Sequence, residues 1–169
     1  MIDSTTRADD AVIVIVFLVR HAHAVDETPA LPDEARHLSE RGRHAARELG
    51  RRLRWHDCTP TAIWTSPLTR AVMTAELVAG TIEWSGPIES VRGLAPGGSA
   101  REVLAAIAAH DPSGSLVLVG HEPSLSGLGG ALTLREDFPA LRKAQAARID
   151  GRELRWLFSY DAEAPTPPA

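Results

Sequence analysis

The sequence predicts a three-layer α/β/α fold with a mostly parallel central sheet and a C-terminal antiparallel hairpin. Short, continuously apolar runs typical of strands buried on both faces alternate with segments of helical periodicity. The pair Asp150-Gly151 separates two strand-like runs near the end of the chain. The length of 169 residues suits one core. We therefore expect a single domain over residues 1–160 and a disordered, proline-rich tail over 161–169.

The first strand and the first helix lie in the N-terminal third of the chain. The run VIVIVFLV at 12–19 is rich in β-branched residues and apolar throughout, which predicts a buried strand. After a loop with two prolines, Ala45, Leu49 and Leu53 recur every four residues and give a helix one apolar face. Serine is a favoured N-cap residue, so we expect this amphipathic helix to begin directly after Ser39.

A second strand and helix follow in the same order. AIWTS at 62–66 predicts a short strand, and Ser66-Pro67 fits an N-cap followed by the first residue of a helix that runs through Val78 and ends at Gly80. The remaining predicted elements are a glycine-rich turn at 94–99, a helix at 102–109, a strand at 116–120, a helix that Pro123 opens, and the two hairpin strands at 144–149 and 153–159.

Composition excludes several classes of protein. Hydrophobic residues make up 44% of the chain and charged residues 24%, as in soluble globular proteins. A net charge of −4 argues against a general nucleic-acid binder. The longest apolar run, 11–19, is too short to span a membrane, and no export signal precedes it, so we expect a cytoplasmic protein without a membrane partner. The lone cysteine, Cys58, excludes an intramolecular disulfide and a cysteine-based metal cluster.

Basic side chains follow each of the predicted parallel strands. The first strand runs into Arg20-His21, the third runs into His121, and Arg70 follows the second at the start of a helix. Because parallel strands end at the same edge of a sheet, we expect these four side chains to converge. Guanidinium groups, imidazoles and a helix N-terminus together suit an anion such as phosphate. Alternatively, either histidine is an ordinary residue at a strand end. Ser66 is explained as a helix cap, and a contact between its hydroxyl and phosphate is a second interpretation.

The segments LVRHA, TSPLTRAVMTA and VGHEP, in which these residues stand, resemble the histidine phosphatase superfamily. That family implies a phosphoglycerate-mutase-like fold. Within the family, the sequence is most similar to the SixA-type phosphohistidine phosphatases, because of its short chain and the segments HLSERGRHAA and GLAPGGSA. The resemblance implies that His21 is the nucleophile that becomes phosphorylated, and that Arg20, Arg70 and His121 hold the phosphoryl oxygens.

The chemistry of these groups agrees with the implied roles. A neutral imidazole is a good nucleophile near pH 7. Guanidinium forks and a protonated imidazole at His121 can stabilise the charge on the phosphoryl oxygens. With two arginines in the pocket, we expect neither a metal ion nor another cofactor.

One departure from the family pattern bears on the substrate. Members that cleave phosphomonoesters usually supply a carboxylic acid to the departing alcohol, and here Gly93 stands where that glutamate is expected. Substitutes are Asp26, Glu27 and Glu122, although each also reads as a solvated loop carboxylate. An imidazole leaves more easily than an alkoxide, since its other ring nitrogen takes up a proton with a pKa of ~6.5. We therefore expect phosphohistidine in a protein as the substrate; the alternatives are a small-molecule phosphomonoesterase and a non-catalytic phosphate-recognition module.

Overall fold

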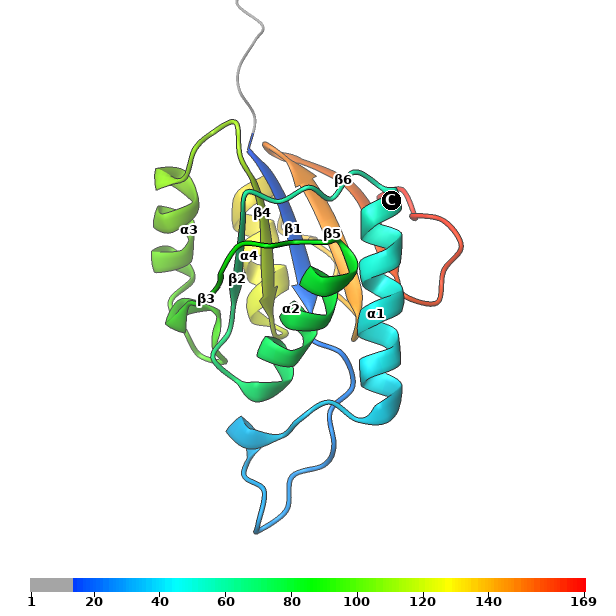
Figure 1. Ribbon diagram of the computed structural model, residues 1–169. Coiled ribbons are helices and arrows are strands. Elements are labelled where there is room, and N and C mark those ends of the chain that lie inside the picture. The colour runs from blue at the N-terminus through cyan, green and yellow to red at the C-terminus, as the bar shows by residue number, and fades with distance from the viewer. Residues whose placement is uncertain (1–13) are drawn as a thin grey trace, which may run out of the picture.

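A computed structural model of the protein describes residues 14–169 and contains one six-stranded sheet between two layers of helices (Figure 1). The strands are β1 (Ile15–Arg20), β2 (Ala62–Thr65), β3 (Ile88–Ser90), β4 (Ser115–Gly120), β5 (Gln145–Asp150) and β6 (Glu153–Ser159). The helices are α1 (Glu40–Trp55), α2 (Thr69–Thr81), α3 (Ala100–Ala109) and α4 (Ser124–Thr133), with short 3-10 turns η1 (Asp33–Ala35) and η2 (Arg92–Leu94). The first two residues of the predicted first strand lie outside the described residues.

The sheet has the strand order β3-β2-β4-β1-β5-β6. The strands β3, β2, β4 and β1 run parallel to one another, whereas β5 pairs antiparallel with both β1 and β6. Gly151 forms the turn of this terminal hairpin with a φ of 61°, a backbone conformation that favours glycine. The predicted α/β class, with a mostly parallel sheet and a C-terminal hairpin, is confirmed.

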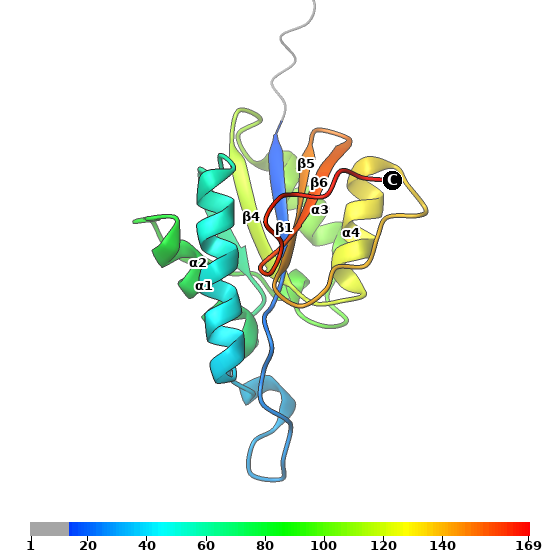
Figure 2. The ribbon, with the colours of Figure 1, turned by 90° about the vertical axis from the view of Figure 1, so that its right-hand side faces the viewer.

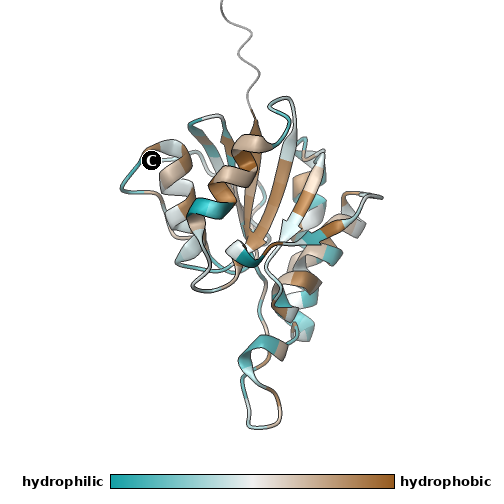
Figure 3. Cartoon of the chain, turned by 90° about the vertical axis from the view of Figure 1, so that its left-hand side faces the viewer, coloured by the Kyte–Doolittle hydropathy of each residue, from teal (hydrophilic) through white to brown (hydrophobic). Residues whose placement is uncertain are grey.

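Alternate residues of β1 pack on opposite faces of the sheet. Phe17 and Val19 lie in one hydrophobic cluster with residues of α1 and α2, and Val16 and Leu18 lie in another with residues of α3 and α4. Figure 2 shows these two helix pairs on either side of the sheet. Because both faces are covered, the strand has no polar face, and Figure 3 shows the central strands as the most continuously hydrophobic part of the molecule.

The start of α2 differs from the predicted start. The helix begins at Thr69 with Leu68 as its N-cap, and it continues past Gly80 to Thr81. The prediction that Ser66 caps this helix is wrong, because two further residues follow it before the helix begins. Its hydroxyl oxygen instead accepts the backbone N–H of Leu68 at 3.3 Å and bonds His121.

The third strand along the chain, β3, is an element that the sequence does not predict. It has only three residues, of which Ile88 is half-buried and the next two are exposed, so no apolar run marks it. Its parallel pairing with β2 creates the strand. The next helix, α3, is confirmed, but it begins two residues before its predicted start because Ser99 caps it by accepting the N–H of Glu102.

The C-terminal segment 161–169 lies partly along β6, whereas we expect it to be disordered. Thr166 and Leu157 exchange two backbone hydrogen bonds, of 2.7 and 2.9 Å. Thr166 stands between Pro165 and Pro167, which favour extended backbone and lack an N–H of their own. It is therefore the residue of this proline-rich stretch that can both donate and accept across a strand.

The start of α1 fixes the backbone that follows β1. Ser39 caps the helix by accepting the N–H of Gly42, as the sequence predicts. A Cβ atom at Gly42 would overlap the carbonyl oxygen of His23, which accepts the N–H of Ser39 at 3.0 Å. Glycine at this position thus lets the helix lie directly against the segment next to His21. Within residues 14–169, no helix is both long and apolar enough to cross a membrane.

Candidate active site

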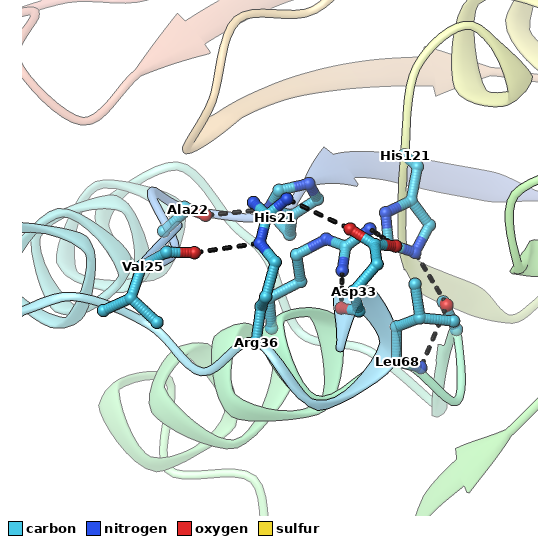
Figure 4. A network of polar contacts seen from close by, with 9 residues as sticks. His21, Ala22, Val25, Asp33, Arg36, Leu68 and His121 are labelled. Atoms are coloured by element: carbon cyan, nitrogen blue, oxygen red, sulfur yellow. Dashed lines mark hydrogen bonds and ion pairs between the residues drawn. The ribbon is translucent and has the colours of Figure 1, made fainter. Parts of the chain in front are cut away.

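The carboxyl ends of β1 and β4 bring the two predicted strand-end histidines together. These strands are neighbours, with Arg20 in register with Gly120, and the backbone N–H of His21 donates to the carbonyl of Gly120 at 3.1 Å. The His21 and His121 rings follow with centroids 5.0 Å apart and planes inclined by 55° (Figure 4). The parallel register therefore sets the spacing of the two imidazoles.

His21 is held in one orientation and kept uncharged. Its Nδ1 lies 2.7 Å from the carbonyl oxygen of Ala22. A carbonyl only accepts, so Nδ1 carries the proton and the lone pair is on Nε2. The side chain is buried, and that burial lowers the pKa of His21 to about 3, against the opposing effect of the hydrogen bond to Ala22 and with smaller contributions from His121, Arg70 and Arg20. At pH 7 the residue is a neutral imidazole with an available ring nitrogen.

His121 is held from a different side. Its Nε2 lies 2.7 Å from the hydroxyl of Ser66, a residue that the sequence marks as a candidate contact of phosphate. Burial and the charge of Arg70 lower the pKa of His121 to about 4, and the carboxylate of Asp33 opposes this shift. The ring is therefore neutral at pH 7 in this structure, whereas the sequence predicts a protonated imidazole.

Arg20 and His121 each carry a buried nitrogen without a partner. Arg20 donates from one terminal nitrogen to the carbonyl of Leu141 at 2.8 Å. Among the described residues, Arg20 Nε and His121 Nδ1 have no hydrogen-bond partner. Buried polar atoms are nearly always satisfied in folded proteins. Two unsatisfied nitrogens in one site suit an acceptor-rich ligand such as a phosphoryl group.

The guanidinium of Arg70 enters the site from the first turn of α2, and the loop between β1 and α1 (residues 22–39) meets it there. Arg70 donates to the backbone carbonyl of Asp33 at 2.8 Å and to its carboxylate at 3.2 Å. The other carboxylate oxygen accepts from Arg36 at 3.0 Å (Figure 4). Asp33 and Arg36 are site residues that the sequence reading misses, since no apolar strand precedes them and only the folded loop brings them to Arg70.

The carboxylates predicted as substitute acids do not join this cluster. Glu122 accepts hydrogen bonds from the backbone N–H of Leu141, at 2.9 Å, and from the hydroxyl of Ser126. Its carboxylate thus links the start of α4 to the segment before β5. Asp26 and Glu27 are exposed in the loop between β1 and α1. The assignment of Glu122 or Asp26 as the acid therefore stays a prediction, which these contacts do not favour.

Gly93, where a glutamate is expected, lies in η2 against α3. A Cβ atom there would lie 2.7 Å from Val103 Cγ2 and 3.0 Å from the carbonyl oxygen of Ser99. A larger side chain does not fit unless α3 moves, so glycine at this position is explained by packing.

Three comparisons relate the chain to known proteins. A model of the histidine phosphatase superfamily (branch 1) matches residues 16–95. An uncharacterized protein of Picosynechococcus is 36% identical over 113 residues, which are 65% of this chain and 67% of that protein.

Solved structures share the fold. The protein histidine phosphatase SixA complexed with tungstate superposes with a TM-score of 0.79 at 24% identity, over 86% of this chain and 97% of that chain. SixA from Agrobacterium tumefaciens gives 0.77 at 24% identity over the same shares of both chains. A phosphoglycerate mutase from Bacillus anthracis gives 0.63 at 16% identity, over 93% of this chain and 92% of that chain.

Proposed function

The chain belongs to the histidine phosphatase superfamily (branch 1), and from this membership we propose that it removes the phosphoryl group from phosphohistidine in proteins through a covalent intermediate on His21. The observation that carries the proposal is the hydrogen bond between His21 Nδ1 and the carbonyl of Ala22. It fixes the tautomer in which Nε2 is the nucleophile. The resemblance to SixA structures agrees with this substrate class.

In the first step, the lone pair of His21 Nε2 forms a bond to phosphorus as the bond from phosphorus to the leaving group breaks. The lowered pKa keeps the nucleophile free of a proton through the neutral range. In the second step, water forms the new bond to phosphorus and His21 leaves as an imidazole, which releases inorganic phosphate. Dividing one displacement into two lowers the barrier of each.

Arg20, Arg70 and His121 stabilise the negative charge of the transferred group. A phosphoryl group carries negative charge on three oxygens, and guanidinium groups match such oxygens with paired N–H donors. The dianion also supplies the countercharge that favours a protonated imidazole, so its binding is expected to raise the pKa of His121 from about 4. His121 then donates to the phosphoryl oxygens.

At this site, the residues that the structure describes include no evident proton donor for an alcohol, which favours phosphohistidine over a phosphomonoester. Asp33 is the carboxylate that meets this cluster, and both of its oxygens accept hydrogen bonds from guanidinium groups. That is the arrangement of an ionised carboxylate, which accepts protons in hydrogen bonds and has none to give. An imidazole leaving group takes its proton on its own second nitrogen and needs no such donor.

The test is to trap the intermediate. Wild type and His21→Ala are each incubated with a phosphohistidine protein and with an aryl phosphate, and the enzyme is examined for acid-labile phosphate. Wild type is expected to hydrolyse the phosphohistidine protein and to become labelled, and His21→Ala to lose activity by a factor on the order of 10⁴ or more. His44→Ala, which removes an exposed histidine of α1, is the matched control.

The outcomes separate the candidate functions. Turnover of small phosphomonoesters with no activity on phosphohistidine would make the chain a phosphomonoesterase. Phosphate binding without turnover or label would make it a recognition module.

A further inference from the structure

A cationic cavity of about 420 Å³ adjoins the candidate active site. The end of β1, the first turns of α1, the segment that precedes β5 and the end of β6 with the residues after it form its walls. Arg20 lines this cavity and also belongs to the histidine cluster, so the two sites share a wall. The other side chains of the cavity that bear or can bear charge are His23, Arg41, Arg142, Lys143 and Asp161.

The charge of this cavity is the opposite of the charge of the whole chain. Within residues 14–169, four cations line it, against the single carboxylate of Asp161, which lies 3.9 Å from Arg142. The protein as a whole carries a net charge of −4. The only lysine of the chain, Lys143, stands here beside three of its seventeen arginines. The positive patch is therefore local and does not follow from overall composition.

The cations of the patch act on one another. Burial lowers the pKa of Lys143, and the charges of Arg20, Arg36 and Arg41 lower it further, while the carboxylate of Asp26 opposes the shift. Burial together with the charges of Arg41 and Lys143 likewise lowers the pKa of His23, again against the opposing carboxylate of Asp26. An anion in the cavity would relieve this repulsion.

The position of the charges indicates the kind of anion. Arg41, Arg142 and Lys143 are exposed, so their charged ends are reached from outside the molecule. Such an open patch would surround little of a small metabolite. A protein substrate, in contrast, can place surface carboxylates on the patch while its phosphoryl group reaches His21. Exposed charges of this type increase the rate of association and select partners by their charge.

We infer that this cavity binds acidic side chains that neighbour the phosphohistidine on the substrate protein. The inference rests on the proposed function and adds to it a preference among phosphoproteins. The recognition is separate from the chemistry, because Arg41 and Lys143 lie outside the group that holds the phosphoryl oxygens.

The experiment compares two phosphohistidine peptides of equal length, one with glutamates and one with glutamines around the histidine. Wild type is expected to hydrolyse the acidic peptide with a kcat/KM about tenfold higher, through a lower KM. In Arg41→Gln and Lys143→Gln the preference is expected to fall about two- to fivefold each, and in the double variant to vanish. Hydrolysis of p-nitrophenyl phosphate, which has no flanking carboxylate, stays unchanged in all three.

The matched control is Arg101→Gln, which removes an exposed arginine from α3 on the opposite face of the sheet and is expected to keep the full preference. Equal hydrolysis of both peptides by wild type would overturn the inference and leave the proposed function standing. The inference would also be overturned if Arg101→Gln weakened the preference as much as Lys143→Gln, since the preference would then depend on the net charge of the protein and not on this cavity. Hydrolysis of neither peptide would overturn the proposed function, and the inference with it.

Discussion

The ends of β1 and β4 and the loop at 22–39 meet in one site, but they hold their side chains by different means. His21 and His121 are 6% and 3% exposed, and the parallel register of two central strands fixes their backbones. Asp33 has a side chain that is 44% exposed and is held by ion pairs with Arg36 and Arg70. Figure 1 shows this loop projecting beyond the carboxyl edge of the sheet.

The difference separates a rigid part of the site from an adjustable one. Buried groups fixed by a strand ladder keep their geometry whatever binds, whereas an exposed ion pair contributes little stability and exchanges readily with another anion. Arg70 belongs to both parts, because it is buried itself while its carboxylate partner is exposed. A phosphoryl group that binds Arg70 therefore competes with Asp33, and the strand-end histidines need not move.

The largest expected effect comes from the buried part. Arg70→Gln is expected to lower kcat/KM about 10²- to 10³-fold, because one of the charges that we propose to stabilise the transferred phosphoryl group is lost. Steady-state kinetics with the phosphohistidine protein measure it, with circular dichroism to confirm that the variant is folded. A loss of less than about fivefold in a folded variant would mean that Asp33 keeps Arg70 away from the substrate.

The next effect is on stability at low pH. The folded-state pKa values of His21 and His121 are about 3 and about 4, both below the ordinary 6.5. Below pH 6.5 the unfolded chain binds protons that the folded chain excludes. The free energy of unfolding is thus expected to fall as the pH drops from 6.5 to about 4, by up to about 1.4 kcal/mol per pH unit for each histidine.

Denaturant unfolding at a series of pH values measures this slope. His21→Asn is expected to remove the contribution of His21 to this slope between pH 6.5 and 4. His44→Asn, on the exposed face of α1, is expected to leave the slope unchanged. An unchanged slope in His21→Asn would show that the folded protein protonates this histidine normally.

The smallest effect is expected from the loop. Asp33→Asn weakens the ion pair with Arg70 and is expected to tighten inhibition by inorganic phosphate about two- to fivefold, with little change in the free energy of unfolding. Glu34→Gln, which changes the exposed neighbouring carboxylate, serves as the control. Weaker inhibition by phosphate in Asp33→Asn would instead make Asp33 a residue that positions Arg70 for its ligand.

The part of the site that the sequence predicts is the part that secondary structure dictates. Continuous apolarity reveals β1 and β4, and the residues that end them then follow from the rule that parallel strands share an edge. Asp33 and Arg36 follow no such pattern, because the path of a loop depends on contacts that form only in the folded chain, here between Asp33 and Arg70 of α2 and between Arg36 and Val25 within the loop. The strand β3 is missed for a similar reason, since its pairing partner rather than its own residues creates it.

The close contact between Gly42 and the carbonyl of His23 has a consequence for genetics. Any side chain at this position pushes the start of α1 away from the backbone two residues after His21. A screen for loss of activity should therefore recover substitutions of Gly42 together with those of His21, even though the glycine has no group that reaches a substrate. Alleles at this position would be mistaken for changes of the catalytic apparatus unless the geometry of the helix start is considered.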